Sequence, residues 1–476
     1  MEFSLQLSLI DDLNIKDGED EGLLVLEMPP QAHRGLVRLK QVTPTLAALL
    51  RSLQGGMATV PGLIGQAMQS DGPGGIAKIN HYLQTAGRNA LLCFSAVGDE
   101  TPLATIEPRC AYFHFKEGAV DAESAYVLSK FALLRALDGG LVLECPTGYA
   151  RIRIHDSRMC SVVNALSRPH TSAELAAAFP DLGEDGIGAF LTLLVNANAL
   201  VTSDDGNAEP EAQDPVMAQW EFHDLVFHAR ARLGRHADPY GGTFPFMDRF
   251  EAPPPVKPRL SEEVVELYTP DLDALKTSDL SFTEVLEGRQ SLRDQGDPPI
   301  TVEQLGEFLY RTARIKGLAE DAGVSWRPSP GGGAIHELDI YPLVSNCTGL
   351  ANGLYHYNAR EHLLSKASEP SPLTGMLAQL GGITARLDAP PQVLLLVTAR
   401  FQRIQIKYQS MTYAVILKNV GALYQTFYLV ATAMNLSPCA LGGGHADLFN
   451  QITGLNYYEE TTVGEFILTS RPPEAD

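Results

Sequence analysis

Cysteine is scarce in this chain of 476 residues, and basic residues are fewer than acidic ones. The six cysteines are scattered without a C-x-x-C pair, so they fit neither a zinc site nor a disulfide framework, and no metal centre is predicted. The formal net charge is −21. Because nucleic-acid proteins normally present a basic face, we expect neither nucleic acid nor an anionic membrane as a partner. The acidity favours solubility, or alternatively attraction of a basic peptide.

Long apolar runs and targeting signals are also missing. The most apolar run, 420–434, belongs to a longer stretch that is interrupted by Lys418, Asn419 and Gln425. It is shorter than the roughly 20 residues that span a membrane, so we expect a buried core or interface helix. The first four residues lack the basic region of a signal peptide. These features predict a cytoplasmic protein with reduced thiols and no membrane partner.

The first 200 residues contain a repeated pattern. Strand-like runs occupy 22–29 and 36–40, and similar runs occupy 140–146 and 150–154. In each copy three helices and a closing strand are expected to follow, which is the element order of a small winged-helix unit. The predicted helices are 44–53, 59–68 and 76–84 in the first copy and 158–166, 171–179 and 187–195 in the second, with closing strands at 90–94 and 199–201.

Two tandem winged-helix-like domains are therefore predicted, at 1–115 and 116–205. Such a pair resembles the peptide-clamp elements of enzymes that modify ribosomally made peptides, and these bind a leader peptide by adding a strand to a sheet edge. Two alternatives stay open. The units could only pack against the catalytic domain, or they could bind DNA, for which Arg158 and Arg168 make a poor basic face.

The remaining chain is predicted to form a linker and one catalytic domain. Residues 206–260 are rich in acidic residues, proline and glycine, which predicts a linker and wrapping segment. Helices alternate with a few strands over 261–476, and an apolar run at 392–398 suits a strand that is buried on both faces. A long helix is expected at 411–436. This region is predicted to be an α+β catalytic domain.

Three segments of this domain carry groups that suit a phosphate and a flat ring. Arg289, Ser291 and Arg293 lie within five residues, and the planar fork of arginine binds phosphate oxygens in pairs. The loop 327–334 is rich in glycine, which lets backbone approach a ring closely. The run 442–444 opens a helix and presents free N–H groups. Its spacing matches neither a Rossmann fingerprint nor a P-loop.

A lysine and a tyrosine, Lys407 and Tyr408, stand between an apolar strand and the long helix. Free tyrosine and lysine have pKa values of roughly 10 and 10.4, and a nearby ammonium favours the phenolate. Tyr408 is therefore a candidate general base that Lys407 tunes or assists by orienting the substrate; the reverse assignment stays open. Arg403 would share a helix face with Lys407 if the segment is helical.

In this order the four segments resemble FMN-dependent azoline oxidases of the cyanobactin type, within the nitroreductase-like superfamily. The resemblance implies that thiazolines or oxazolines in a ribosomally made peptide are oxidised to azoles. A hydride would pass to flavin N5 and a proton to the Lys407–Tyr408 pair, and oxygen would reoxidise the flavin. The implied partners are FMN, an azoline-containing precursor peptide recognised in part by its leader, and a second copy of the chain, with the flavin between the two subunits.

The resemblance also implies a set of site residues. Gly331 stands where many relatives have serine, so a hydroxyl contact would be missing there. Two other functions fit the residues: an NAD(P)H-dependent nitro or quinone reductase, and a peptide-binding scaffold with a degenerate oxidase domain. The catalytic pair would be Lys407 and Tyr408, and the flavin-binding residues would be Arg289, Gln290, Ser291, Arg293, Pro330, Gly331, Gly332, Gly333, Arg403, Leu441, Gly442, Gly443, Gly444 and Arg471.

Overall fold

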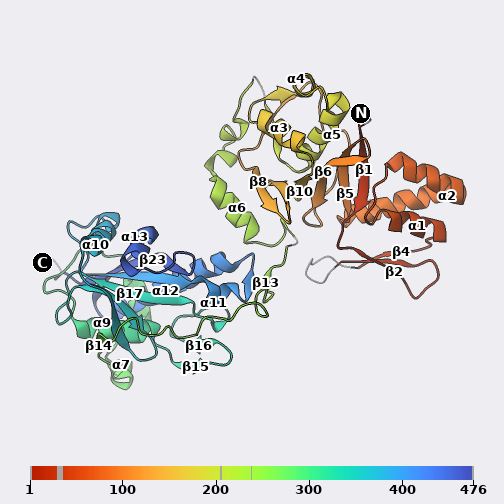
Figure 1. Ribbon diagram of the computed structural model, residues 1–476. Helices are drawn as coiled ribbons and strands as arrows, with labels where there is room; N and C mark the ends of the chain where they lie inside the picture. The colour runs from red at the N-terminus through yellow and green to blue at the C-terminus, as the bar shows by residue number, and fades with distance from the viewer. Residues whose placement is uncertain (1–2, 29–35, 204–205, 237, 474–476) are drawn as a thin grey trace. The chain divides into compact units, whose positions relative to one another are not determined.

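The structure is a computed structural model that describes residues 3–28, 36–203, 206–236 and 238–473 (Figure 1). Pro29 at the end of the first predicted strand, and position 237 within the predicted linker, lie outside the described residues. The chain divides into two compact units, Met1–Tyr240 and Gly241–Asp476. The boundary falls inside the segment predicted to be a linker, and each unit has its own core.

A six-stranded antiparallel sheet forms the centre of the N-terminal unit, with strand order β1-β5-β6-β10-β9-β8. In β10, Ile152 and Ile154 are buried while Arg151 and Arg153 face the other side, as the alternation predicts. Helix α5 covers the apolar face through Ile187 and neighbouring residues. The strands are β1 (Phe3–Leu9), β5 (Leu92–Gly98), β6 (Thr101–Pro108), β8 (Leu133–Leu137), β9 (Gly140–Glu144) and β10 (Ala150–Ile154).

The helices and strands of the predicted repeat are present in both copies. Helix α2 breaks at Gly72, which has a φ of 64° and precedes Pro73, so it provides the second and third helices of the first copy. The capping box of Thr171 and Glu174 begins α4. The elements are β2 (Asn14–Asp17), β3 (Leu24–Glu27), β4 (Val37–Leu39), α1 (Pro44–Ser52) and α2 (Val60–Arg88), then α3 (Ser157–Ala165), α4 (Ser172–Ala178) and α5 (Gly183–Asn196).

Strand pairing repeats as well. In the second copy β7 lies between β11 and the closing strand β12. In the first copy β1 pairs with the closing strand β5 and makes an isolated bridge from Leu7 to Ala58. Strands of both copies share the six-stranded sheet, so the predicted division near residue 115 falls within one sheet. The remaining elements are β7 (Ala125–Leu128), β11 (His170–Thr171), β12 (Leu200–Ser203) and α6 (Phe222–Arg230).

The C-terminal unit is built on a seven-stranded antiparallel sheet of order β14-β19-β18-β17-β20-β23-β22. The two central strands, β17 and β20, are buried along their whole length, which agrees with the continuous apolar run. The strands of this sheet are β14 (Val264–Glu266), β17 (Leu338–Val344), β18 (Gly353–Asn358), β19 (Leu363–Ser368), β20 (Val393–Arg400), β22 (Leu436–Leu441) and β23 (Glu460–Ser470). Two small two-stranded sheets lie outside it: β13 (Gly241–Gly242) pairs with β21 (Tyr408–Gln409), and β15 (Gly317–Ala319) pairs with β16 (Val324–Trp326).

Helix α12 (Thr412–Ala433) packs across this sheet. Phe427 contacts Phe308 of α9 and Phe466 of β23, with ring centroids 5.2 and 5.1 Å away. In the described part of the chain α12 is the one helix whose length and composition would allow a membrane span, but its inner face lies in the core of the unit. The other helices are α7 (Leu272–Ser278), α8 (Phe282–Gly288), α9 (Val302–Ala313), α10 (Pro372–Ala385), α11 (Phe401–Gln405) and α13 (Ala446–Thr453).

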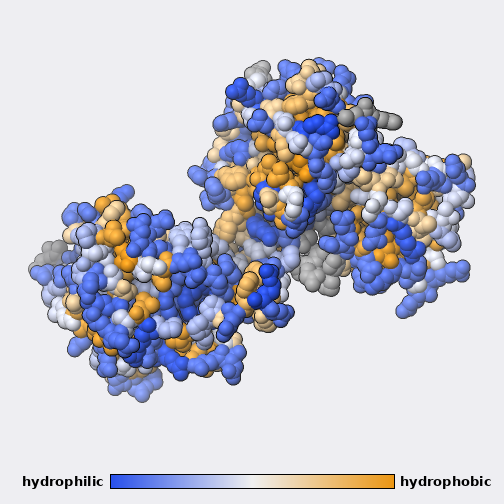
Figure 2. Space-filling view, viewed as in Figure 1, coloured by the Kyte–Doolittle hydropathy of each residue, from blue (hydrophilic) through white to orange (hydrophobic). Residues whose placement is uncertain are grey.

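The visible surface is mostly hydrophilic, with apolar residues gathered in several patches (Figure 2). Large apolar side chains that are exposed include Phe282 on α8 and Tyr413 and Leu417 on α12. Single exposed apolar residues are ordinary, but α12 places two of them on one outer face.

Candidate active site

The backbone of the Lys407–Tyr408 pair is held from two sides. Helix α11 ends at Gln405, so Arg403 and Lys407 do not share a helix face. Tyr408 pairs with Gly242 across the β13–β21 ladder. The Thr412 hydroxyl donates to the Tyr408 carbonyl at 2.7 Å, which ties the pair to the start of α12. The pair is therefore fixed between the segment that enters the C-terminal unit and its longest helix.

The side chains of Lys407 and Tyr408 are partly buried and lie against Gly333. A Cβ atom at Gly333 would come within 2.7 Å of both Lys407 Nζ and Tyr408 Oη. Gly333 also has a φ of 63°, a conformation that other residues adopt at a cost. The ammonium lies 5.3 Å from the centroid of the Tyr408 ring. The glycine-rich loop and the Lys–Tyr pair, which are more than 70 residues apart in the sequence, therefore form one site.

The glycine-rich loop is positioned by buried polar groups. The N–H of Gly332 donates to Asn419 Oδ1 at 3.0 Å, and Asn419 Nδ2 donates to Glu337 Oε1 at 2.8 Å. Gly331 packs under His336, because a Cβ there would lie 2.8 Å from the ring. Burial, helped by nearby arginines, lowers the pKa of His336 to about 4, so this ring is neutral at neutral pH. The conformation of the glycine-rich loop thus depends on Asn419 of α12 and on His336 and Glu337, which directly precede β17.

Arg403 is buried and binds three backbone carbonyls around the site. Its Nη1 donates to the carbonyl of Pro253 at 2.8 Å, and its Nη2 donates to those of Gly323 and Ile335, each at 2.7 Å. These bonds join the wrapping segment to the loop before β17. In this arrangement the Arg403 guanidinium holds together the backbone segments that surround the site.

A buried ion pair lies behind the same loop, in β17 and β20. Asp339 Oδ2 is 2.8 Å from Arg400 Nε, and His356 Nε2 is 3.8 Å from Asp339 Oδ1. Burial alone would raise the pKa of Asp339, but the Arg400 guanidinium and His356 hold it well below its usual range. Asp339 is therefore charged throughout the neutral range.

We expect Asp339→Asn to lower the free energy of unfolding by about 3–5 kcal/mol, because it leaves the buried Arg400 without a counter-charge. Since folding depresses this pKa, the Asp339 contribution is complete above the unfolded value of about 4 and is lost as pH falls below it. Urea unfolding at several pH values measures the difference between wild type and variant. The exposed Asp321→Asn is the control, and equal effects of both substitutions would contradict the buried pair.

The arginine-bearing segment after α8 is joined to β22 by Tyr428 of α12. The Arg289 guanidinium lies 5.2 Å from the centroid of the Tyr428 ring, and Ser291 Oγ is 2.7 Å from Tyr428 Oη. The same hydroxyl accepts from the N–H of Ala440 at 2.8 Å. Arg293 lies beside Cys439, and the side chains of Gln290 and Arg293 are exposed. Two guanidinium groups thus lie beside β22.

Arg471 and the glycine run lie at opposite ends of β22, because Leu436 pairs with Ser470 at its start and Leu441 pairs with Glu465 at its end. Arg471 Nη1 donates to Asn435 Oδ1 at 3.2 Å, and the backbone of Arg471 packs against Gly296. Leu441 is buried, whereas Gly442, Gly443 and Gly444 are exposed before α13. The buried carboxylate of Glu465 touches Gly444, because a Cβ there would lie 1.8 Å from Glu465 Oε1. Burial raises the pKa of Glu465.

Helix α12 separates these groups into two sets. Asn419 holds the glycine-rich loop and Tyr428 holds the arginine segment. They are nine residues apart, which places them roughly 180° apart around the helix and roughly 13 Å apart along it. Within one chain the Lys–Tyr pair with its loop therefore lies on one face of α12, and the arginines lie on the other.

Sequence reasoning missed several residues that organise the site. Tyr428 and Glu465 are polar groups within apolar helix and strand patterns, and that contrast was the available signal. Gly242 had no signal beyond a Gly-Gly pair, because its role depends on pairing with Tyr408 across 166 positions of sequence. Asn419 was visible only as an interruption of an apolar run.

Two family models match the chain. The cyanobactin oxidase model, ThcOx, matches residues 126–237, and the nitroreductase family model matches residues 286–466. The second match covers α12, five strands of the seven-stranded sheet and most of β23, so the C-terminal unit carries a nitroreductase-like domain. The two matches together confirm the expected resemblance to a cyanobactin-type oxidase of the nitroreductase-like superfamily.

Individual relatives are distant. A protein of Methanocaldococcus jannaschii named as a nitroreductase is 24% identical over 196 residues, which is 41% of this chain and 93% of that protein. The trifolitoxin-processing protein TfxB of Rhizobium leguminosarum is 24% identical over 142 residues, or 29% of this chain and 38% of that protein. The E. coli microcin synthetase McbBCD complex with truncated pro-MccB17 contains a chain with a TM-score of 0.33 and 18% identity, covering 53% of this chain and 91% of that one.

Proposed function

We propose that this protein is an FMN-dependent oxidase that converts thiazolines or oxazolines to azoles in a ribosomally made precursor peptide. The observation that carries the proposal is the contact of Gly333 with both Lys407 Nζ and Tyr408 Oη, within a nitroreductase-like domain. A plain reductase has no need for a base beside its glycine-rich loop. The cyanobactin oxidase match over 126–237, and the relative named for trifolitoxin processing, support a peptide substrate.

The residues present fit FMN. Arg289 and Arg293 supply positive charge beside β22, which suits a phosphate, and Arg471 adds a third guanidinium beside Asn435 before the start of that strand. Gly442 and Gly443 are open, since a Cβ at either position would meet no atom within 4 Å, so their backbone can approach a flat ring. Bound FMN would accept a hydride from the substrate ring.

The Lys–Tyr pair would remove the proton. We assign Tyr408 Oη as the group that takes a proton from the ring carbon, and Lys407 Nζ as the group that assists Tyr408 or orients the substrate ring. Gly333 places no side chain against the two groups, and the β13–β21 ladder with Thr412 holds the backbone that carries them. The opposite assignment, with neutral Lys407 as the base, is the alternative.

A complete site would need two copies of the chain. One planar cofactor cannot contact both the arginines and the Lys–Tyr pair of a single chain if these lie on opposite faces of α12. A homodimer resolves this, because each cofactor can meet the arginines of one protomer and the Lys–Tyr pair of its partner. Tyr413 and Leu417, exposed by 47% and 41% on α12, give this helix an outer face suited to such an interface.

The proposed activity is tested with the purified full-length protein, a thiazoline-containing peptide and oxygen. We expect a yellow protein, loss of two hydrogen atoms per ring by mass spectrometry, and formation of peroxide. Rapid bleaching of the flavin by NADH without peptide, and no change in peptide mass, would instead identify a nitro or quinone reductase. A colourless protein that binds no added FMN would identify a scaffold with a degenerate oxidase domain.

A further inference from the structure

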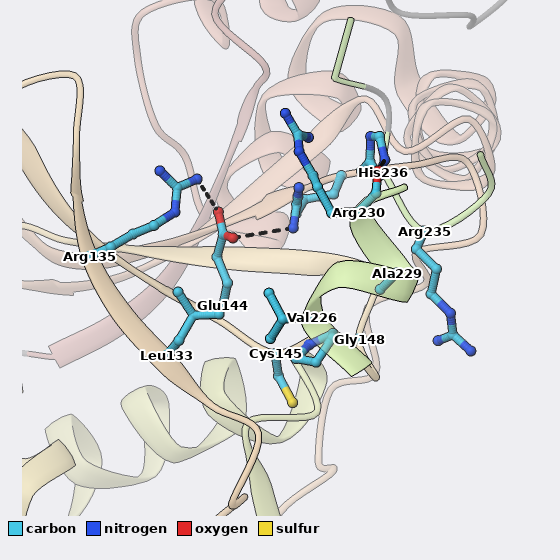
Figure 3. Close-up of a pocket in the computed structure, with 12 residues that line it drawn as sticks. Leu133, Arg135, Glu144, Cys145, Gly148, Val226, Ala229, Arg230, Arg235 and His236 are labelled. Atoms are coloured by element: carbon cyan, nitrogen blue, oxygen red, sulfur yellow. Dashed lines mark hydrogen bonds and ion pairs between the residues drawn. The ribbon is translucent and has the colours of Figure 1, made fainter. Parts of the chain in front are cut away.

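The N-terminal unit contains a charged cavity of about 330 Å³ on the sheet face opposite α5 (Figure 3). Its floor is apolar, with Leu133, Val226 and Ala229, and arginine side chains surround it. This size is at the lower end of the range for ligand pockets in proteins. The charged and titratable lining residues are Arg109, Arg135, Glu144, Cys145, Arg230, Arg235 and His236.

Arginines outnumber acids in this cavity. Glu144 is shared by Arg135 Nη2 at 2.9 Å and Arg109 Nη1 at 3.4 Å. Asp238 is shared in the same way by Arg109 Nη2, at 2.6 Å, and by Arg230. Arg235 points away, since its Nη1 donates to the carbonyl of Thr147 at 2.9 Å, so three arginines face two carboxylates and the cluster has an excess of one positive charge (Figure 3). In a chain of net charge −21 this local excess favours an anionic ligand.

Two buried nitrogens of the cavity have no hydrogen-bond partner among the described residues, Arg109 Nε and His236 Nδ1. His236 Nε2 lies 2.9 Å from the carbonyl of Arg230 and must donate to it, and His236 Nδ1 lies 3.6 Å from Asp238 Oδ2. Burial lowers the pKa of His236, which keeps the ring neutral. The cavity thus offers guanidinium donors beside a neutral imidazole. A peptide residue with a side-chain carboxylate matches the guanidinium donors.

A second cavity, of about 680 Å³, shares Arg109 with the first and extends along the same sheet face. It reaches Ser8 on β1, Ser95 on β5 and Arg151 on β10. Five strand spacings of about 4.8 Å separate β1 from β8, so the two cavities extend over roughly 24 Å, the length of about seven extended residues. Acidic residues also line the second cavity, so the positive excess belongs to the first. The combined length of the two cavities fits a peptide better than a small anion.

We infer that this groove binds an extended peptide segment and that an acidic residue of the segment enters the first cavity, where Arg109, Arg135 and Arg230 bind its carboxylate. Most of the cavity lies within the region that matches the cyanobactin oxidase model. The identity of the peptide as the oxidase precursor rests on the proposed function; the preference for a carboxylate does not.

The test uses the full-length protein and two blocked seven-residue peptides labelled with an uncharged coumarin. One has a central Leu-Glu-Leu between serines, and the other has Leu-Gln-Leu. We expect the acidic peptide to bind about tenfold more tightly by fluorescence anisotropy, as one charge-assisted hydrogen-bond pair allows. The double variant Arg135→Gln/Arg230→Gln should remove this difference, and added salt should weaken only the binding of the acidic peptide.

A matched control separates this effect from general charge loss. Arg51 lies in the same unit, is 40% exposed like Arg135 at 41%, and pairs with Asp17 at 2.6 Å. Arg51→Gln should leave the acidic preference unchanged. Equal binding of both peptides to wild type, or an equal effect of Arg51→Gln, would overturn the inference, as would inorganic phosphate that binds as tightly as the acidic peptide. Flavin content and thiazoline oxidation are measured on the same samples, so a failed oxidase function and a failed carboxylate site give different results.

Discussion

Lys407→Ala and Tyr408→Phe are each expected to reduce turnover of a thiazoline peptide by about 10²–10⁴-fold while the protein keeps its flavin. Each substitution removes a group that lies against Gly333 without removing any of the arginines near β22. The loss should therefore appear in the rate of flavin reduction by the peptide. Stopped-flow absorbance under anaerobic conditions measures that rate directly, apart from reoxidation.

Two further substitutions make this expectation specific. Lys276→Ala and Tyr458→Phe change the same residue types at exposed positions, where the Lys276 side chain is 74% exposed and Tyr458 is 79% exposed, and should leave turnover unchanged. Lys407→Arg keeps the positive charge but cannot lose its proton near neutral pH. If Lys407 acts only through its positive charge, Lys407→Arg retains much of the activity. If Lys407 is the base, the arginine variant is as slow as Lys407→Ala, and native rates in both Lys407→Ala and Tyr408→Phe would reject the pair altogether.

Local structure was readable from the sequence because its causes are local. The side chain of Thr171 caps a helix through a contact three residues away, and that helix begins there as predicted. The break at Gly72–Pro73 separates two predicted helices because proline removes a helix donor and glycine allows a positive φ. The repeat in the first 200 residues was visible for the same reason, since each copy has its own alternation and caps.

The rest depends on contacts between distant segments. Nothing in the pattern of either copy predicts that β6 of the first pairs with β10 of the second, although this pairing merges the two units into one sheet. Arg403 has a helical position and a charge, yet its partners are carbonyls at 253, 323 and 335. The segments expected to carry the chemistry were found from the sequence, but their division between two faces of α12 required the coordinates.

If α12 divides the site in this way, we expect activity to return when two inactive variants are combined in one heterodimer. The homodimers of Arg289→Ala/Arg293→Ala and of Lys407→Ala should each be nearly inactive, the first for lack of bound cofactor and the second for lack of the pair that removes the proton. In a crossed heterodimer, one site combines the intact arginines of one protomer with the intact Lys–Tyr pair of its partner. The other site carries both defects.

We therefore expect the crossed heterodimer, purified through two different affinity tags, to work at about half the wild-type rate per dimer. If the arginines and the Lys–Tyr pair of one chain served the same cofactor, each site of the crossed heterodimer would carry one defect and it would be inactive. A heterodimer of wild type with Lys407→Ala is the control, because it retains one intact site under either arrangement. Failure to recover any heterodimer would contradict the homodimer itself, whereas an inactive crossed heterodimer beside a half-active control would show that α12 does not divide the site.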